Sequence, residues 1–241
     1  MNRVSLFLYL IHMTRLPANV YPHNLRALLN NGFVVVKNQL ISTRQGCRQS
    51  TSIRLFRYIH GEMSSIGIIP ALRRSEDISH LVESTASKVF LMFGELSLLP
   101  RSVQQLKKLG KKVYLHCDLM KGLSHDKEAL TYIADHIQPA GIITTKGHMI
   151  KHAKSLGLEA ILHLFIIDTN ALTTGIEKIT STKPHGIEIM PGLMPDVVRE
   201  IHKHTSAPLY VGGLVKTHEQ AAALLDAGAT GVVSGHTPLW H

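Results

Sequence analysis

The sequence predicts a compact (β/α)8 TIM barrel that follows a poorly structured basic N-terminal extension. Eight short apolar runs recur about 19 to 28 residues apart from Ile66 onward, and a helix-like stretch separates each run from the next. Buried parallel strands have this composition, and eight strand–helix units in about 175 residues fit a small closed barrel. A doubly wound open sheet is the structural alternative, but the chain lacks the glycine motif of dinucleotide-binding sheets.

The uneven distribution of charge predicts the extension. The chain of 241 residues has a formal net charge of +9 at pH 7. Residues 1–62 contain eight Lys and Arg but one acid, a net charge of +7, so residues 63–241 carry +2. The first segment has no helical or strand period, and its short apolar start lacks the cleavage site of a signal peptide. We expect little structure over 1–62, a functional start at Met63 and one barrel domain over 63–241; a basic arm that contacts nucleic acid is the alternative.

Composition excludes several classes of protein. Hydrophobic residues make up 44% of the chain and charged residues 18%, which indicates a packed core. Two cysteines do not form a disulfide framework, and Cys117 lies in an apolar run where it is expected to pack as a small hydrophobe. No apolar run reaches eighteen residues, so we expect no membrane contact and a cytoplasmic protein.

The expected strands are short and β-branched, as in "IGIIP", "AGIIT", "LYVGG" and "GVVSG". In chain order they begin near Ile66, Lys88, Lys112, Ala140, Glu159, His185, Pro208 and Thr230.

The expected helices lie between these runs, over residues 75–84, 100–110, 126–137, 147–157, 170–181, 195–205 and 217–228. Ser102 and Thr217 are each followed three residues later by Gln, the pattern of a capping box. Pro195 suits a first helical turn. Glycines follow three of the helices where a left-handed cap is needed, at Gly110, Gly157 and Gly228.

Small residues end the last two strands and predict a phosphate site. The chain reads "VGG" at the end of one strand and "SGHTPLW" after the next. The residues at these ends, Gly212, Gly213, Ser234 and Gly235, have no side chain or a small one, so a ligand can approach the backbone. Backbone N–H groups without side-chain obstruction bind phosphate, and barrels often place such a site after strands seven and eight. Tight turns alone are the alternative explanation for these glycines.

Polar residues at the other strand ends are candidates for ligand contacts, since the carboxyl ends of barrel strands form the site face. In chain order they are Arg73, Glu95, His116, Asp118, Lys121, Lys146, Asp168 and Glu188. Asp118 can accept hydrogen bonds from a ligand hydroxyl, and Lys146 can pair with it or with an anion. Catalysis by this pair, or a structural ion pair, remains an alternative.

Neither the histidines nor the lysine cluster predicts a site by itself. The sixteen histidines are scattered without metal-site spacing, and pairs such as His148 and His152 are expected to be solvated helix residues, so we expect no metal. Lys107, Lys108, Lys111 and Lys112 lie at the face opposite the expected site, where they could contact phosphates of a nucleic acid or form a solvated loop.

Several motifs together resemble the glycerol uptake operon antiterminator family, the glycerol-3-phosphate-responsive antiterminators known as the GlpP family. They are "IIPALR", "VYLHCDLMKGLSHDKEAL", "IQPAGIITTK", "FIIDTNAL", "IEIMPGLMP" and "PLYVGGLVKTHEQAAALLDAGATGVVSGHTPLW". The resemblance covers Ile66 to Trp240, whereas residues 1–62 do not match the pattern.

The resemblance implies a transcription regulator and not an enzyme. Its members are thought to bind glycerol 3-phosphate as an effector, without a cofactor, and to act on the leader mRNA of glycerol-utilisation genes so that termination is prevented. Gly212, Gly213, Ser234 and Gly235 would then hold the phosphate. The hydroxyl end would face Arg73, Asp118, Lys146 and Glu188, an assignment that depends on strand-end position.

Three questions stay open at this stage. A homo-oligomer could build the RNA-binding surface that a barrel of net charge +2 does not obviously offer. An isomerase or synthase with a phosphate substrate, with Asp118 and Lys146 as acid and base, is the first alternative function. A protein-binding module is the second.

Overall fold

The computed structural model describes residues 33–36, 39–42 and 67–241. The chain divides into two compact units, Met1–Met63 and Ser64–His241. In the first unit, β1 (Phe33–Val36) pairs with β2 (Gln39–Ser42) in antiparallel register. This pairing was not predicted, although "FVVV" is rich in the β-branched residues that favour strands. The rest of the predicted extension, and the expected start at Met63, lie outside the described residues.

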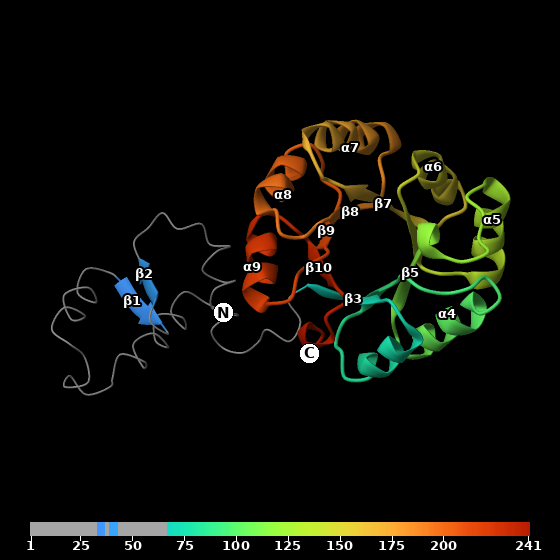
Figure 1. Cartoon of the computed structure of the whole chain (residues 1–241), viewed down its shortest axis with the longest axis horizontal. Coiled ribbons are helices and arrows are strands. Elements are labelled where there is room, and N and C mark those ends of the chain that lie inside the picture. The colour runs from blue at the N-terminus through green and yellow to red at the C-terminus, as the bar shows by residue number, and fades with distance from the viewer. Residues whose placement is uncertain (1–32, 37–38, 43–66) are drawn as a thin grey trace, which may run out of the picture. The chain divides into compact units, whose positions relative to one another are not determined.

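The second unit is a closed barrel of eight parallel strands, which confirms the predicted fold class (Figure 1). Each strand begins within two residues of its predicted start, and the last strand pairs with the first. The strands are β3 (Ile68–Leu72), β4 (Lys88–Leu91), β5 (Lys112–His116), β6 (Gly141–Thr144), β7 (Glu159–Phe165), β8 (Gly186–Met190), β9 (Leu209–Gly212) and β10 (Gly231–Ser234).

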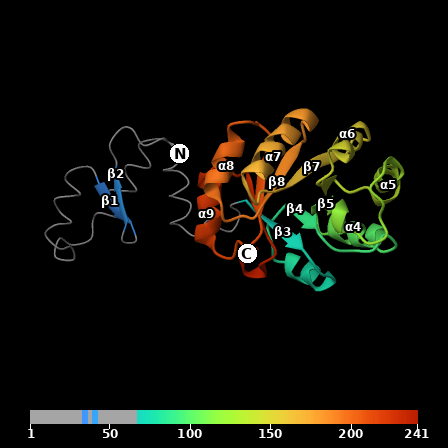
Figure 2. The ribbon, with the colours of Figure 1, turned by 45° about the horizontal axis from the view of Figure 1, so that its top comes forward.

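Helices surround the strands as an outer ring, which the tilted view makes clear (Figure 2). They are η3 (Ser75–Leu81), α4 (Leu99–Lys108), η4 (Cys117–Leu119), α5 (Lys127–Tyr132) with its π-helical continuation η5 (Ile133–Ile137), α6 (Gly147–Ser155), α7 (Thr169–Thr182), α8 (Pro195–His202), α9 (His218–Asp226) and η6 (Thr237–Leu239). Within the described part of the chain, no helix is long and apolar enough to cross a membrane.

Most of the predicted helix ends are confirmed. Thr217 and Gln220 form the expected reciprocal capping box at the start of α9. Pro195 is the first residue of α8. The three glycines after helices have φ values of +74°, +76° and +109°, in the region where a residue without a β carbon is least strained. Local sequence chemistry therefore specifies where these helices begin and end.

Two helix predictions are wrong. The predicted α-helix over residues 75–84 is instead a 3-10 helix over Ser75–Leu81. The Asp77 carboxylate accepts hydrogen bonds from the N–H groups of Arg73 and Arg74, which fastens a tight turn to the end of β3. Ser102 does not cap its helix, because α4 already begins at Leu99 with Pro100 in its first turn.

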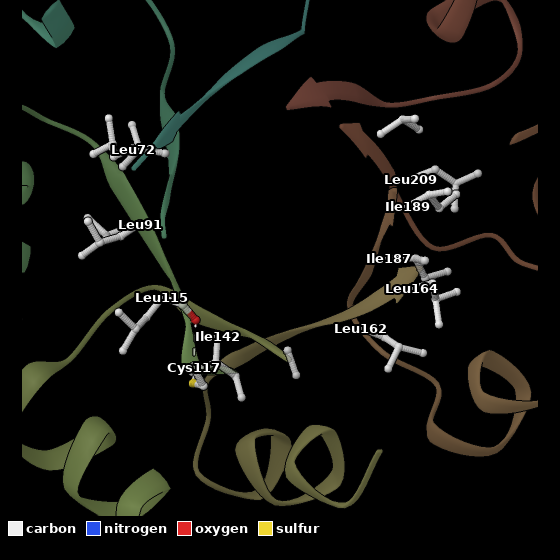
Figure 3. Packing of buried hydrophobic residues seen from close by; sticks show 14 of the residues in the cluster. Leu72, Leu91, Leu115, Cys117, Ile142, Leu162, Leu164, Ile187, Ile189 and Leu209 are labelled. Carbon is white, nitrogen blue, oxygen red and sulfur yellow. Dashed lines mark hydrogen bonds between the residues drawn. The ribbon is translucent and has the colours of Figure 1, made fainter. Parts of the chain in front are cut away.

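The main hydrophobic core lies between the barrel and the helices. Side chains that leave the outer side of the strands, among them Leu72, Leu115, Ile142, Leu164 and Ile187, point toward the helices (Figure 3). Cys117 packs in this outer layer as predicted, and burial raises the pKa of its thiol to about 12. The thiol is therefore protonated at neutral pH and behaves as a small hydrophobe.

A second core fills the inside of the barrel. Phe90, Tyr114 and Tyr210 pack at its centre, with ring centroids 5.6 to 5.7 Å apart. Toward the amino ends of the strands, Lys88 Nζ donates to the Tyr210 hydroxyl at 2.9 Å and the Tyr114 hydroxyl donates to Glu159 at 2.7 Å. The amino end is thus packed and its polar groups are paired, which leaves the carboxyl end as the face that a ligand can approach.

Close contact between β6 and β7 gives a test of the barrel packing. A β carbon on Gly141 would overlap the backbone carbonyl of Glu159, whereas one on Gly175 in α7 would meet the flexible ends of Leu164 and Ile166 at 3.3 to 3.4 Å. We expect Gly141→Ala to lower the free energy of unfolding by about 2 kcal/mol or more. Gly175→Ala, the matched control, should change it by less than about 1 kcal/mol, because better helix propensity offsets the contact. Urea denaturation measures both, and equal effects would contradict this account.

Candidate functional site

The predicted phosphate residues lie together on adjacent strands at the carboxyl end of the barrel. β10 pairs with β9 on one side and with β3 on the other. Gly212 ends β9 and Gly213 follows it, and Ser234 ends β10 and Gly235 follows it. Arg73 directly follows β3. We call these five residues the glycine arc.

Glycine is required at two positions of the arc for reasons of packing and backbone conformation. A β carbon on Gly212 would lie 2.8 Å from Cβ and from the carbonyl oxygen of Val233, so this glycine allows β9 and β10 to pair closely. Gly213 has φ +82°, and the next residue, Leu214, has φ +65°. A left-handed conformation is strained for a leucine by about 1–2 kcal/mol, so the fold holds this loop in a specific shape.

The side chain of Ser234 is fully used within the fold. Its hydroxyl donates to the Val215 carbonyl at 3.0 Å and accepts from the His236 N–H at 3.1 Å. Its carbonyl accepts from the Trp240 indole N–H at 2.8 Å, which fastens the chain end that includes η6. Ser234 therefore shapes the loop after β10, and the predicted phosphate contact of its hydroxyl would compete with these bonds.

Arg73 lies beside the phosphate residues and not with the other predicted contacts of the hydroxyl end. A β carbon on Gly235 would lie 3.1 Å from Cδ of Arg73, so the glycine leaves room for the arginine side chain. The Asp77 carboxylate fixes the Arg73 backbone through its N–H, at 2.8 Å. Among residues 67–241, no carboxylate lies within ion-pair distance of the Arg73 guanidinium, whereas the Arg74 guanidinium lies 3.7 Å from Asp77.

Asp118 and Lys146 form a second group on the neighbouring strands β5 and β6. Asp118 lies in η4, just after β5, and Lys146 precedes α6. The Asp118 carboxylate accepts hydrogen bonds from the Thr144 hydroxyl at 2.8 Å and from the Thr145 N–H at 2.7 Å. Lys146 Nζ lies 3.5 Å from the same carboxylate. The two predicted residues therefore meet as an ion pair, and Asp118 ties the end of β5 to the end of β6.

The environment of Asp118 stabilises its charged form. Burial alone would raise the pKa of this carboxyl, but the hydrogen bonds from Thr145 and Thr144 and the charge of Lys146 outweigh that effect and lower the pKa below its ordinary value of 3.8. A carboxylate with a lowered pKa is a weak general base at neutral pH. The geometry suits a fixed acceptor for hydroxyl groups or a structural link better than an acid–base catalyst.

Glu188 lies inside the barrel, below the strand ends. It is fully buried, and its Oε2 accepts a hydrogen bond of 2.6 Å from Nδ1 of His163, a buried residue on the adjacent strand β7. His116, from β5, packs its ring against His163 with the centroids 5.0 Å apart. Each of these three residues can offer a ligand atom to a metal ion, and the three atoms lie within 4.8 Å of one another.

His163 was missed in the sequence, and a signal for it exists. In the strand "EAILHLF", side chains point alternately to the inside and the outside of the barrel. Ile161 belongs to the inner core, so His163, two residues later, lies on the same inward face of β7. A histidine on the inward face of a buried strand differs from the solvated helix histidines that the chain otherwise suggests. The spacing rules for metal sites did not detect it because the three residues come from three separate strands.

Three other candidates have structural roles. Asp168 caps α7, since its side chain accepts from the Ala171 N–H at 2.7 Å. Glu95 forms an exposed ion pair of 3.7 Å with Lys121. Of the four clustered lysines, Lys111 is anchored to the barrel, because its Nζ donates to the carbonyls of Ser84 at 2.6 Å and Ala86 at 2.9 Å. Burial lowers the pKa of Lys111. The exposed lysines of this cluster are Lys107, Lys108 and Lys112.

Exposed apolar side chains lie on the loops after three strands next to the glycine arc. Ile167 follows β7, Leu193 follows β8 and Leu214 follows β9, and their exposed fractions are 81%, 46% and 66%. Phe165, at the end of β7, is 58% exposed. We call these four residues the apolar rim.

Comparison with known proteins finds one family that spans the barrel. The family model described as "Glycerol-3-phosphate responsive antiterminator" matches residues 68–240. The crystal structure of a glycerol uptake operon antiterminator regulatory protein from Listeria monocytogenes is similar, with a TM-score of 0.70 and 33% identity over 72% of this chain and 94% of that chain. An antiterminator-related protein from Thermotoga maritima gives 0.65 and 30% over 72% and 97%.

More distant matches show the fold alone. An uncharacterized protein of Escherichia coli is 28% identical over 173 residues, which cover 72% of this chain and 91% of that protein. The orotidine 5'-phosphate decarboxylase of Pyrococcus horikoshii has a TM-score of 0.55 but 17% identity, over 69% of this chain and 88% of the enzyme.

The anchoring of Asp118 predicts a pH-dependent contribution to stability. We expect Asp118→Asn to lower the free energy of unfolding by about 1.5–3 kcal/mol at pH 7, because it weakens hydrogen bonds to a charged group. The pKa of Asp118 is lowered in the folded protein, so this contribution is present above the unfolded pKa and is lost as pH falls through the folded value. Urea denaturation should therefore give a difference between wild type and variant that shrinks below pH 4. The exposed Glu83→Gln is the control for charge removal, and a pH-independent difference would contradict the assignment.

Proposed function

The chain belongs to the glycerol-3-phosphate responsive antiterminator family, and from this premise we propose that it binds glycerol 3-phosphate at the carboxyl end of its barrel and acts on the leader of an mRNA. In this proposal the bound effector prevents termination in the leader of glycerol-utilisation genes, so that transcription continues. The observation that carries the proposal is the glycine arc, where the ends of three adjacent strands bring glycine backbone beside Arg73, whose guanidinium has no carboxylate partner among residues 67–241.

The phosphate would occupy the glycine arc. A phosphate ester is strongly anionic, and bidentate contact with a guanidinium is among the stronger interactions available to it. Arg73 is held beside Gly235 without a carboxylate partner among residues 67–241, so binding would not require breaking an existing ion pair. Gly213 and Leu214 both have positive φ, so the backbone of the loop after β9 has a specific conformation. We therefore assign Arg73 to the phosphate end, together with Gly212, Gly213 and Gly235, and Ser234 to the shaping of that loop.

The hydroxyl end would face Asp118, Lys146 and Glu188. Charged groups that already have partners can accept or donate one more hydrogen bond to a polyol without a change of charge. The Asp118 carboxylate retains acceptor capacity beyond its contacts with Thr144 and Thr145, and one oxygen of Glu188 has no hydrogen-bond partner.

The same geometry favours a sensor over the enzyme alternative. Acid–base catalysis works best with groups whose pKa lies near the working pH. The pKa of Asp118 is lowered by its hydrogen bonds and by Lys146, which moves it away from that range. An orotidine 5'-phosphate decarboxylase and two aldolases with a similar fold share 17%, 11% and 11% identity with this chain, so they support the barrel and not a reaction.

Control of RNA binding requires two forms of the protein that the effector distinguishes. A ligand shifts such an equilibrium only by its difference in affinity for the two forms. The apolar rim supplies a physical basis, because Ile167, Leu193 and Leu214 gain contacts if their loops close over a bound ligand. We propose that glycerol 3-phosphate favours this closed rim and that the closed rim binds RNA more tightly.

A pair of neighbouring arginines tests the phosphate assignment. We expect Arg73→Gln to weaken glycerol 3-phosphate binding by about 10- to 100-fold, the loss expected for one charge-assisted contact. Arg74→Gln is the matched control, because Arg74 is the next residue, carries the same charge and pairs with Asp77 instead. Calorimetric titration measures both, with glycerol and inorganic phosphate as reference ligands. Equal weakening in both variants would contradict a specific role for Arg73.

A leader-RNA titration tests the regulatory step. We expect RNA affinity to rise in the presence of glycerol 3-phosphate in the wild-type chain, and to be insensitive to it in Arg73→Gln. Gel shift at fixed salt measures this, since affinity for nucleic acid depends strongly on salt. RNA affinity that is identical with and without the effector would overturn the mechanism. Turnover of glycerol 3-phosphate or a triose phosphate that is lost in Asp118→Asn would instead support the enzyme alternative.

A further inference from the structure

Three buried residues inside the barrel form a cluster, of which only Glu188 is also assigned to the proposed effector site. His116, His163 and Glu188 come from β5, β7 and β8, and their side chains converge with ligand-capable atoms within 4.8 Å of one another. Their exposed fractions are 4%, 2% and 0%, so each is more than nine-tenths buried. The cluster lies in the carboxyl half of the barrel interior, away from the paired Lys88, Tyr210, Tyr114 and Glu159 groups of the amino half.

Each member of the cluster has a buried polar atom that has no hydrogen-bond partner among residues 67–241. These atoms are Nδ1 of His116, Nε2 of His163 and Oε1 of Glu188. An unpaired buried polar group costs about 1–3 kcal/mol, and more when it is charged. Three such atoms in one place point to a ligand that satisfies all of them.

The hydrogen bond between His163 and Glu188 indicates which kind of ligand fits. In the neutral tautomer that carries its one proton on Nδ1, His163 donates to Glu188 Oε2 at 2.6 Å. Nε2 therefore presents a lone pair. Histidines that bind metals commonly donate the other ring N–H to a carboxylate in this way, which fixes the tautomer and the ring orientation.

Charge supports a cation in the same position. Glu188 is the one carboxylate of the cluster and is fully buried, and among residues 67–241 its one ion-pair partner is His163. A buried carboxylate is stabilised by pairing with a cation or by coordination to a metal.

We propose that His116, His163 and Glu188 bind one divalent transition-metal ion of the zinc class inside the barrel. Two imidazoles and one carboxylate are a donor set that zinc and related ions accept, with bond lengths of about 2.0–2.2 Å. The three ligand atoms, which lie within 4.8 Å of one another, would have to close on a common centre to form bonds of that length. Cys117 is not part of the set, because its thiol lies in the outer core and its pKa is raised to about 12.

Titration of the full-length chain with metal tests the proposal. The protein is treated with a chelator, and Zn²⁺ is then added in competition with a chromophoric chelator. We expect one Zn²⁺ per chain, bound about 100-fold or more weakly by His163→Gln and by His116→Gln. His204→Gln is the matched control, because His204 is an exposed histidine on the surface that pairs with Glu200, and it should bind Zn²⁺ as the wild type does.

Cobalt identifies the ligands without relying on the variants. Co²⁺ bound to the wild-type chain should give visible absorption bands of a low-coordinate nitrogen and oxygen site, without the intense near-ultraviolet band of a cobalt–thiolate bond. Circular dichroism shows whether each variant is folded. If a variant is not folded, the cobalt spectrum of the wild-type chain still shows whether nitrogen and oxygen atoms bind the metal.

Three results would overturn the proposal. They are a folded wild-type chain that binds no Zn²⁺ or Co²⁺ stoichiometrically, equal affinity in folded His163→Gln and His204→Gln, and a thiolate band in the cobalt spectrum. Calorimetric titration with glycerol 3-phosphate, in the presence of chelator and of Zn²⁺, keeps the two proposals apart. Loss of metal binding with intact effector binding contradicts the metal site alone, and loss of effector binding with intact metal binding contradicts the effector site alone, although Glu188 is assigned to both.

Discussion

The pairing of β10 with β3 is the constraint on which the rest of the structure depends. It joins Val232, Val233 and Ser234 to Ile68, Ile69 and Pro70, at opposite ends of the barrel sequence. Closing so long a loop costs chain entropy, which the buried inner and outer cores must offset. Once closed, the sheet has no edge, and the ends of β9, β10 and β3 become neighbours. The glycine arc exists only because of that closure: Gly212 allows β9 to approach β10, and Gly235 makes room for an arginine from β3.

Among the described residues, the buried polar groups inside the barrel are hydrogen-bonded in its amino half and partly without partners in its carboxyl half. Near the amino ends of the strands, the hydroxyls of Tyr210 and Tyr114 are bonded to Lys88 and Glu159, and the aromatic rings fill the space between them. In the carboxyl half, one buried nitrogen or oxygen atom in each of His116, His163 and Glu188 has no hydrogen-bond partner within the described part of the chain. A fold that served stability alone would place apolar residues there, since unpaired buried polar groups are destabilising. We therefore infer that the amino half of the barrel interior contributes mainly to stability and the carboxyl half to binding.

The fold followed from the sequence more fully than the site did. Short β-branched runs locate every barrel strand, because their signal is local, and Pro195 and Thr217 mark helix starts through their own backbone chemistry. The residue types at the carboxyl end were also foreseeable from strand ends. Their partners were not: that Arg73 lies beside Gly235, or that His163 bonds to Glu188, depends on which strands are adjacent and which faces point inward. Such contacts are set by tertiary packing, which no spacing along the chain contains.

The same packing limits how a bound effector could alter an RNA-binding surface. The exposed lysines Lys107, Lys108 and Lys112 lie near the amino end of β5, opposite the glycine arc. The interior between the two ends is close-packed around Phe90, Tyr114 and Tyr210, and such interiors do not deform continuously. A signal that crossed the barrel would require a second arrangement of that packed layer. The apolar rim needs no such rearrangement, because its exposed side chains are on loops beside the arc. Effector control is therefore expected at the carboxyl rim, while the lysines supply at most a contact that the effector leaves unchanged.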